Sequence, residues 1–490
     1  MPEALQHKHV VIIGGGISGL TTCYRLWVEG QARQLPLMIT LLEASDRVGG
    51  VIATTCAQGF LLERGPDCFI TVKPWGIRLC EELGLQAALL GTTPQYRRSF
   101  IVRDGRLLPV PPGFYLMAPG SLWSLLATPL FSWRGKLRMA LDLILPRRHA
   151  TTDESLAQFV MRRLGREALT HLAQPMVAGI YTADPQHLSM QATMPQFLQM
   201  EQQHRSLILA MMRARKQPRV HQGMEQGVSG PRYGLFVSFR RGMQTLIEAL
   251  VARLPAPSVR LRAHVRQIRW QPETARWLVN LEDQPPLEAD ALCLALPAPQ
   301  AGRLLAAVDA QLAMALQEIP YASTAIVHVA YHRQDVTHPL DGMGFVVPAV
   351  EQRSLIACSF SSVKFPGRAP PQHVLLRAFV GGALQPEQYA RPDAELIRAV
   401  CQDLQQLLGI RGEPLYVDIS RHPQAIAQYH LGHQQRIARL EGLVARLPGL
   451  ALAGNAYHGI GVPDCIQSGN SAAQALLTYL TTTMRAPASA

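Results

Sequence analysis

The chain has 490 residues, of which 48% are hydrophobic and 17% charged, and it carries a formal net charge of +12. This length and apolar content predict two or three folded domains and argue against large-scale disorder. The positive charge favours an anionic partner, such as a membrane surface or an acidic substrate. Nucleic acid is not expected, because the sequence has no zinc knuckle, no RNP-type aromatic motif and no long lysine or arginine block.

The eight cysteines are widely scattered and form no C-x-x-C pair, so we expect neither a metal site nor a disulfide framework. The apolar N-terminal segment runs into a glycine turn rather than to a signal-peptide cleavage site. Both features predict a reducing, cytoplasmic compartment.

The first predicted element is a strand over 9–13, followed by a glycine turn and a helical pattern. Gly14, Gly16 and Gly19 have the G-x-G-x-x-G spacing of a dinucleotide-binding turn. The first glycine allows a tight bend, the second lets backbone N–H groups approach a pyrophosphate, and the third lets the helix pack on the strand. The candidate cofactor contacts at this helix N-terminus are Gly14, Gly16, Ile17, Ser18 and Gly19.

A second buried strand is predicted over 37–42, and Glu43 ends it, 24 residues beyond Gly19. This is close to the offset of about 20 residues at which a carboxylate binds ribose hydroxyls. Because a carboxylate disfavours a ribose phosphate, NADP is not expected. The alternative is that Glu43 is only a solvated strand end.

An E-x-x-x-R-x-G-G arrangement follows the second strand, and its candidate contacts are Glu43, Ala44, Arg47, Gly49 and Gly50. An NAD dehydrogenase has no need of it. An FAD protein does, because the glycines leave room for the diphosphate and the arginine helps to neutralise it. The next candidate contacts are Gly65, Pro66 and Asp67. They form a turn at which the backbone can approach a ring of the cofactor. The combination indicates an FAD-binding protein.

A helix is predicted from Pro74, and no residue from 107 to 133 is charged. Prolines and glycines interrupt this stretch too often for one membrane-spanning helix. Basic residues then surround an apolar segment, namely Arg134, Lys136, Arg138, Arg147 and Arg148. This pattern is typical of a segment that lies on a membrane. The alternative is a wall of a helical domain or of a substrate tunnel.

Further along the chain, Thr152 is predicted to cap a helix, and 217–231 is predicted to be a surface loop. Strands are predicted at 235–239, 258–270, 276–282 and 287–299. From Thr324 on, alternation predicts a mixed or antiparallel sheet over 324–331, 344–348, 355–360 and 374–382. The chain is predicted to end with a strand, a glycine-rich loop and a helix that opens near Ser468.

The two turns and the loop between them resemble those of the flavin amine oxidase superfamily. Stretches at 178–189 and 453–469 are similar to motifs of its protoporphyrinogen and coproporphyrinogen III oxidases, and the resemblance covers almost the whole chain. It implies a mixed α/β fold with three domains. These are a discontinuous Rossmann-like FAD-binding domain (1–72, 232–300 and 440–485), a mixed-sheet substrate-binding domain (73–95 and 301–439) and a mainly helical, membrane-associating domain (96–231).

The resemblance also implies the roles of single residues, with FAD bound non-covalently. Gly454, Ile460, Gly461 and Val462 belong to a loop and helix start that face the pyrimidine end of the flavin, where a helix N-terminus stabilises negative charge. The strand around Val265 holds the adenine side.

Arg98, next to Arg97, aligns with an arginine that binds a substrate propionate. No general base or nucleophile is expected, because positioning and electrostatics suffice. Two positions depart from the family. His458 stands where an acid is usual, which changes the charge near the ring unless the histidine is merely exposed, and Arg241 stands where a second glycine is usual.

The implied reaction is the oxidation of a porphyrinogen to the porphyrin, with O2 as acceptor and H2O2 as product, in heme biosynthesis. Protoporphyrinogen IX and coproporphyrinogen III stay open as substrates, because the charge of +12 suits four propionates but also a membrane. The N-terminal motifs are also compatible with a carotenoid desaturase, an amine oxidase, or a non-catalytic FAD-binding protein at a membrane surface. Peripheral contact with the cytoplasmic membrane is expected, and a homodimer is compatible with the resemblance.

Overall fold

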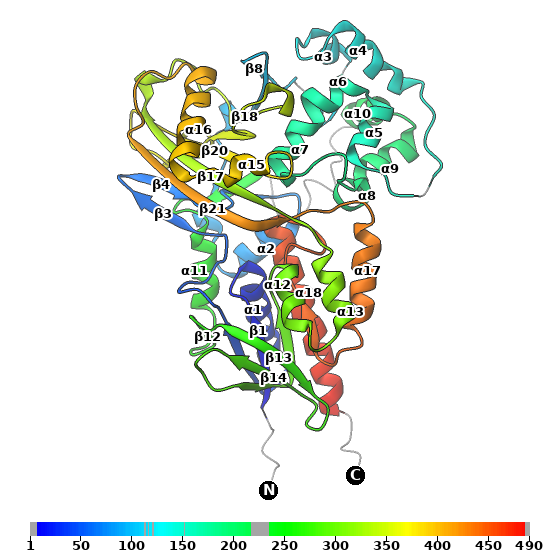
Figure 1. The fold of residues 1–490 in the computed structure, drawn as a ribbon, viewed down its shortest axis with the longest axis vertical. Coiled ribbons are helices and arrows are strands. Elements are labelled where there is room, and N and C mark those ends of the chain that lie inside the picture. The colour runs from blue at the N-terminus through cyan, green and yellow to red at the C-terminus, as the bar shows by residue number, and fades with distance from the viewer. Residues whose placement is uncertain are drawn as a thin grey trace.

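The computed structural model describes residues 7–111, 114–115, 117–119, 122–150, 152–216 and 235–485. The molecule is elongated. One half holds a parallel sheet with its helices, and the other half holds a large sheet beside a group of helices (Figure 1).

The parallel sheet has the strand order β12-β2-β1-β16-β22, with all neighbouring strands parallel. The strands are β1 (Lys8–Ile13), β2 (Leu37–Leu42), β12 (Val259–Arg260), β16 (Ala291–Leu294) and β22 (Leu450–Leu452). Most of their residues are buried, as expected of a parallel sheet covered on both faces. The helices α1 (Ile17–Ala32) and α18 (Val462–Arg485) pack against each other beside this sheet.

Smaller elements complete this half of the molecule. They are the sheet of β5 (Phe69–Ile70), β11 (Phe236–Phe239) and β6 (Leu89–Gly91), and the sheet of β13 (Val265–Gln271), β14 (Arg276–Leu281) and β15 (Leu287–Ala289). The hairpin of β3 (Thr54–Ala57) and β4 (Phe60–Glu63) lies instead beside the large sheet (Figure 1). The helices are α2 (Pro74–Glu82), α11 (Gln244–Ala252), α12 (Ala298–Leu305), α13 (Ala310–Gln317) and α17 (His433–Val444). Of these, α2 packs on α18 and α17 packs on α13.

The large sheet has seven strands in the order β21-β17-β20-β19-β18-β7-β8. They are β7 (Phe100–Arg103), β8 (Arg106–Pro109), β17 (Tyr321–His332), β18 (Gly344–Val346), β19 (Ala357–Phe360), β20 (His373–Gly381) and β21 (Tyr416–Ala427). All pairs are antiparallel except β18 with β7. Its helices are α14 (Ser361–Lys364), α15 (Pro386–Ala390) and α16 (Asp393–Leu408).

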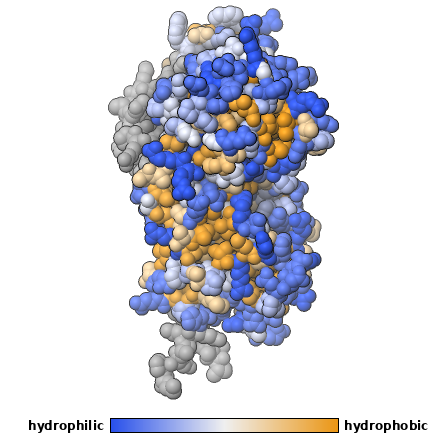
Figure 2. All heavy atoms as spheres, turned by 90° about the vertical axis from the view of Figure 1, so that its left-hand side faces the viewer, coloured by the Kyte–Doolittle hydropathy of each residue, from blue (hydrophilic) through white to orange (hydrophobic). Residues whose placement is uncertain are grey.

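The helical group lies beside this sheet (Figure 1). It contains a two-stranded pair, β9 (Phe114–Tyr115) and β10 (Ala118–Pro119), and the helices α3 (Leu122–Ala127), α4 (Trp133–Ala140), α5 (Leu156–Arg163), α6 (Arg166–Ala168), α7 (Gln174–Tyr181), α8 (Met190–Thr193), α9 (Pro195–His204) and α10 (Leu207–Lys216). A π-helical turn over Leu169–Ala173 joins α6 to α7. Figure 2 shows the face that lies on the left-hand side in Figure 1. On this face, apolar residues gather at mid-height between hydrophilic margins.

The predicted fold class, a mixed α/β fold with a Rossmann-like sheet, is confirmed. Four local predictions are wrong. Ser155, not Thr152, caps α5, because its side chain accepts from Gln158 N within a capping box. The last helix begins at Val462 rather than near Ser468. The predicted strand over 258–270 is two strands in different sheets, β12 and β13. The predicted strand over 287–299 is likewise divided into β15 and β16, which lie in different sheets, and α12 begins at Ala298.

Strand pairing crosses two of the predicted domain boundaries. Residues 100–109, assigned to the helical domain, form β7 and β8 of the seven-stranded sheet. Residues 89–91, assigned to the substrate-binding domain, form β6, which pairs with β11. The three-domain division itself stays a prediction, and the predicted loop at 217–231 lies outside the described residues.

Within the described ranges, no helix is long and apolar enough to cross a bilayer. The described parts of 107–133 fold into short strands and α3, as their prolines and glycines predict.

Candidate active site

The glycine turn lies at the carboxyl end of β1, between the ends of β2 and β16. Gly14 N donates to Leu42 O at 2.8 Å, and Ala295 N donates to Ile13 O at 2.8 Å. Gly14 has φ +110°, and a Cβ at Gly19 would lie 1.9 Å from Gly14 O. These two glycines are therefore required by the chain's own packing.

Gly16 differs, because a Cβ placed on it meets no atom within 4 Å. Gly16 is the N-cap of α1, and no side chain caps this helix end. The turn therefore leaves room and unsatisfied backbone N–H groups where the fingerprint predicts a pyrophosphate. This cradle fits a dinucleotide cofactor.

The predicted ribose-binding carboxylate lies against the same turn. Glu43 Oε2 accepts from Gly15 N at 2.6 Å, and its Oε1 accepts from Ser45 N at 2.9 Å. Ala44 is exposed beside it. Gly49 N donates to Gly15 O at 2.8 Å, so the loop after β2 is fixed to the glycine turn.

The Arg47 side chain is hydrogen-bonded within that loop. Its guanidinium donates to the carbonyl oxygens of Val48, Gly50 and Ile52. A Cβ on Gly50 would lie 3.3 Å from Gly16 Cα, so this glycine allows the close approach of the two loops. The positive charge of Arg47 stays exposed at the edge of the turn.

The segment before Val265 joins the same site. Ala263 N donates to Glu43 O at 2.9 Å, and Arg262 N donates to Ser45 O at 2.9 Å. Val265, the first residue of β13, follows this segment by two residues.

The C-terminal loop meets the turn from the other side. Ala453 N donates to Leu294 O at 3.0 Å, and Gly454 N donates to Ser468 Oγ at 3.0 Å. The helix α18 then starts at Val462, directly after Ile460 and Gly461. Ser18 Oγ donates to Cys465 O at 3.0 Å, so the N-terminal turns of α1 and α18 converge.

The Gly65 turn is fixed by two cations, Lys364 at the end of α14 and the buried Arg377 on β20. Arg377 Nη2 donates to Gly65 O, and Lys364 Nζ lies 2.9 Å from Asp67 Oδ2. Burial alone would raise the pKa of Asp67, but the charges of Lys364 and Arg377 outweigh it and hold that pKa well below its usual range. The Asp67 carboxylate is thus paired with cations of the protein itself, and Pro66 and Gly65 precede it in the same turn.

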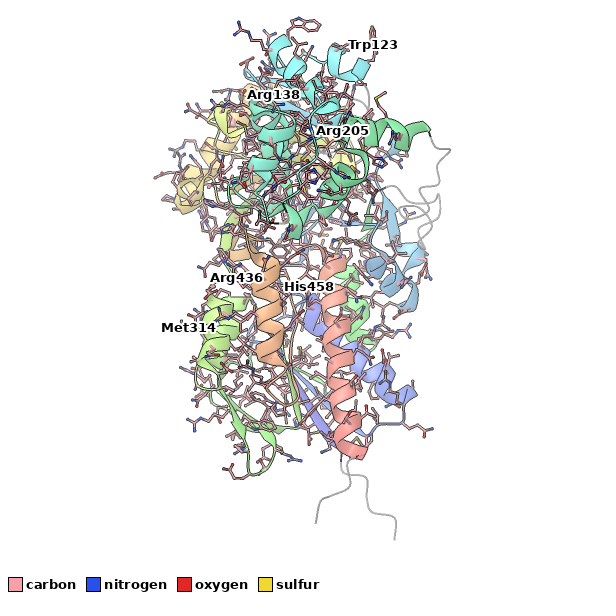
Figure 3. The ribbon with its side chains drawn as sticks, turned by 90° about the vertical axis from the view of Figure 1, so that its right-hand side faces the viewer. Trp123, Arg138, Arg205, Met314, Arg436 and His458 are labelled. Carbon is pink, nitrogen blue, oxygen red and sulfur yellow. The ribbon has the colours of Figure 1, made fainter. Side chains whose placement is uncertain are left out.

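Arg98 lies before β7, and its half-exposed guanidinium is already paired. It forms an ion pair with the Asp341 carboxylate, and its Nε donates to Asp341 O at 2.7 Å. His458 is exposed, and its Nε2 lies 3.0 Å from Glu441 Oε1 on α17 (Figure 3). Arg241 is exposed as well, whereas the retained Gly242 has φ +91° and packs on Thr54.

The sequence did not point to the side chains that hold these loops from outside. They are Lys364, Arg377, Tyr429 and His433. The sequence did contain one signal for Arg377, because this arginine interrupts the apolar run of β20. A buried charge requires a partner, so a buried ion pair could have been predicted there.

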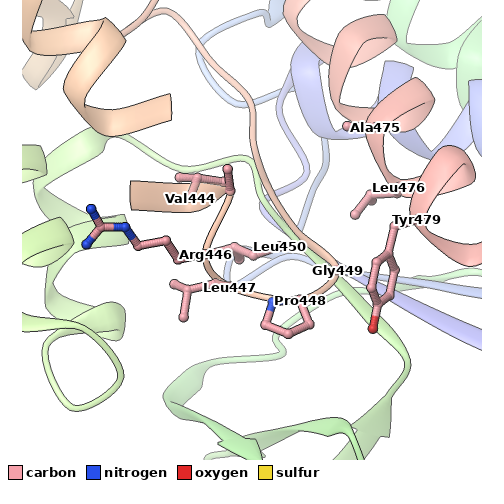
Figure 4. A pocket seen from close by; sticks show the side chains of 10 residues that line it. Val444, Arg446, Leu447, Pro448, Gly449, Leu450, Ala475, Leu476 and Tyr479 are labelled. Carbon is pink, nitrogen blue, oxygen red and sulfur yellow. The ribbon is translucent and has the colours of Figure 1, made fainter. Parts of the chain in front are cut away.

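A separate hollow of about 380 Å³ lies between the end of α17, β22 and α18 (Figure 4). Its lining includes Arg446, Leu450 and Tyr479. It sits at the amino end of β22, whereas nucleotides bind outside the carboxyl ends of parallel strands. It is therefore not the cofactor site. Among the described residues, no cluster of three or more His, Cys, Asp or Glu side chains could hold a metal ion.

Buried histidines around the site make the fold sensitive to acid. Burial, with Arg377 and Arg64 nearby, lowers the pKa of His328 from 6.5 to about 3, and burial lowers that of His433 to about 4. Between pH 6.5 and these values the unfolded chain binds protons that the folded chain does not, so stability falls as the pH falls through this window.

We expect His328→Gln to reduce the slope of unfolding free energy against pH in that window, by up to about 1.4 kcal/mol per pH unit. Urea unfolding at several pH values measures the slope. His187→Gln, at an exposed site, is the control and should leave it unchanged. An unaltered slope in His328→Gln would show that this histidine titrates normally in the folded state.

The chain matches the family model "Flavin containing amine oxidoreductase" over residues 17–477. It is 35% identical over 474 residues to the coproporphyrinogen III oxidase of Bacillus subtilis (strain 168), covering 96% of this chain and 98% of that protein. It is 32% identical to the protoporphyrinogen oxidase of Homo sapiens, covering 96% and 98%.

Among solved structures, a putative protoporphyrinogen oxidase from Exiguobacterium sp. 255-15 superimposes with a TM-score of 0.83 at 33% identity, over 96% of this chain and 98% of that one. A reduced UDP-galactopyranose mutase shares the fold at 15% identity with a TM-score of 0.71, covering 99% and 97%. The glycine turn, the adjoining carboxylate and these full-length matches agree, and the chain belongs to the flavin-containing amine oxidoreductases, with FAD as its cofactor.

Proposed function

We propose that this enzyme oxidises a porphyrinogen to the porphyrin with O2 in heme biosynthesis, and that coproporphyrinogen III is its preferred substrate. The observation that carries the proposal is full-length similarity to enzymes named for this reaction. Two coproporphyrinogen III oxidases are 35% identical to this chain and a third is 30% identical, while five protoporphyrinogen oxidases are 27% to 33% identical.

The reaction removes six hydrogens from the macrocycle. A bound FAD would supply two-electron transfer from the substrate to O2, so one porphyrinogen and three O2 would give one porphyrin and three H2O2. No base on the chain is needed to start it, since the electron-rich pyrroles favour loss of hydrogen from the carbons that join them.

The chain's own part is to hold and orient. We propose that Gly16 and the start of α1 bind the pyrophosphate, that Glu43 binds the adenosine ribose, and that Val265 lies at the adenine. The loop before α18 then lies at the pyrimidine edge of the flavin, where the helix N-terminus stabilises negative charge.

The substrate proposal is tested by porphyrin fluorescence with each porphyrinogen under the same conditions. We expect kcat/KM to be at least about tenfold higher for coproporphyrinogen III, which corresponds to about 1.4 kcal/mol of transition-state binding. A preference for protoporphyrinogen IX would reverse the proposed substrate, and turnover of neither would refute the enzymatic function.

We further propose that Arg98 binds a substrate propionate, which would then replace Asp341 as its partner. Arg98→Ala should raise KM more than it lowers kcat, by about 1–3 kcal/mol in kcat/KM. The exposed neighbour Arg97 provides the matched control, Arg97→Ala. Equal effects of the two variants would remove the specific role of Arg98.

Contact with a membrane surface is proposed for the tip of the helical group. Its exposed apolar side chains are Trp123 (79% exposed), Leu126, Trp133 (68%), Leu137, Leu141 and Ile144. Trp123 stands at the end of the molecule opposite the end of α18 (Figure 3). Arg134 and Arg147 are exposed beside them, a combination that suits an anionic lipid surface. Their exposure supports the membrane interpretation over an internal tunnel wall.

We therefore expect the protein to sediment with anionic liposomes at low salt and less so at high salt, because salt screens the arginine charges. Trp133→Ser with Leu137→Ser should reduce the bound fraction severalfold. Met314→Ser, at a side chain that is 64% exposed on α13, is the control and should not. Full recovery in the supernatant at low salt would contradict the proposed membrane contact.

A further inference from the structure

The flavin-facing loop, defined here as Asn455–Gly461, is held from behind by two aromatic side chains. Tyr429 Oη donates to Asn455 O at 2.8 Å and accepts from Gly459 N at 2.7 Å. His433 Nε2 lies 3.0 Å from Tyr457 O. Three backbone groups of one short loop are thus satisfied by two side chains outside it.

The two aromatic rings also fix each other. The phenol of Tyr429 and the imidazole of His433 stack with their centroids 3.8 Å apart and their planes 13° apart. Each residue is 2% exposed. Tyr429 O accepts from Ser189 N at 2.8 Å, so the segment that carries the tyrosine is itself bonded to the start of α8.

The protonation states suit these contacts at neutral pH. Burial raises the pKa of Tyr429, so its hydroxyl keeps the proton that it donates to Asn455 O. Burial lowers the pKa of His433 to about 4, so its ring is neutral. Because Tyr457 O can only accept, Nε2 must carry the ring proton.

We propose that Tyr429 and His433 are positioning residues that set the shape of the flavin-facing loop, and through it the affinity and reduction potential of FAD. The inference rests on the proposed cofactor site. The loop leads directly into α18, whose N-terminus would stabilise negative charge on a flavin ring bound beside it. A loop that loses its outer support holds these dipoles less well, so reduction becomes less favourable.

Tyr429→Phe is the first test, because it keeps the stacked ring and removes both hydrogen bonds to the loop. FAD is titrated into the deflavinated protein, and the flavin midpoint potential of the reconstituted protein is measured. We expect Kd to rise at least about tenfold and the potential to fall, since buried backbone groups lose their partners. Tyr331→Phe, at a buried tyrosine of the large sheet, is the matched control and should change neither.

A pair of substitutions at His433 separates the hydrogen bond from general packing. His433→Gln retains a side-chain N–H donor, whereas His433→Leu does not. We expect His433→Gln to keep the Kd for FAD within about threefold of that of the parent protein, and His433→Leu to raise it further. Equal losses in both variants would overturn the positioning role of this histidine.

The result that would overturn the whole inference is an unchanged Kd and potential in Tyr429→Phe, or changes equal to those in Tyr331→Phe. If Gly16→Val abolishes FAD binding in the same assay, the proposed cofactor site stands and only the positioning role fails. If Gly16→Val also leaves FAD binding intact, the cofactor site itself is wrong.

Discussion

Replacing Gly16 by valine is expected to abolish FAD binding while the protein still folds. A Cβ placed here meets no atom within 4 Å, and the backbone, with φ −71°, is one that valine adopts. The added methyl groups would instead fill the space in which backbone N–H groups approach the pyrophosphate. Flavin absorbance of the purified protein measures the loss, and circular dichroism checks the fold.

Gly442→Val is the matched control, because this glycine of α17 also has open space around it and lies on the exposed surface. It should keep a full flavin absorbance. Gly14 is unsuitable, since a Cβ there would lie 2.3 Å from Ala295 O and disturb the fold itself. A Gly16→Val protein with a full flavin absorbance would contradict the proposed pyrophosphate site.

The second large effect is expected at Arg163, whose side chain is completely buried with that of Asp142. Its guanidinium donates to the Asp142 carboxylate and to the carbonyl oxygens of Pro146 and Arg205. Arg163→Met would leave the Asp142 carboxylate buried without a cation, which costs about 3–5 kcal/mol. Urea unfolding should show this loss in the helical group.

Arg166→Met, at an exposed arginine of the next helix, should change stability by no more than about 0.5 kcal/mol. A similar small change in Arg163→Met would mean that the buried pair contributes little, as some buried ion pairs do when apolar residues replace them.

The sequence predicted those features that depend on short-range pattern. The strand before the glycine turn, the strand over 37–42 and the turn itself lie where they were expected. Their apolar runs and glycine spacing are local signals that tertiary contacts do not override. The same holds for β17 and β20, whose long alternating segments were recognised.

Features that depend on tertiary contacts were either predicted wrongly or not predicted at all. Thr152 was predicted to cap the helix over Leu156–Arg163, but Ser155 caps it. Glu154 lies before that helix and pairs with Arg148 and Arg162. The roles of Tyr429 and His433 could not be read from the sequence, because the groups they bind are backbone atoms of a loop more than twenty residues away. Such contacts carry no residue-type signal.

A flavin bound at the Gly16 turn should take electrons from a porphyrinogen and return them to O2. The most direct measurement mixes the FAD-bound enzyme with coproporphyrinogen III without oxygen, follows flavin absorbance and porphyrin fluorescence, and then admits air. We predict that the flavin bleaches, that air restores its colour, and that each porphyrin formed is accompanied by three H2O2. If neither coproporphyrinogen III nor protoporphyrinogen IX bleaches the flavin, the proposed oxidation of a porphyrinogen by this enzyme is wrong.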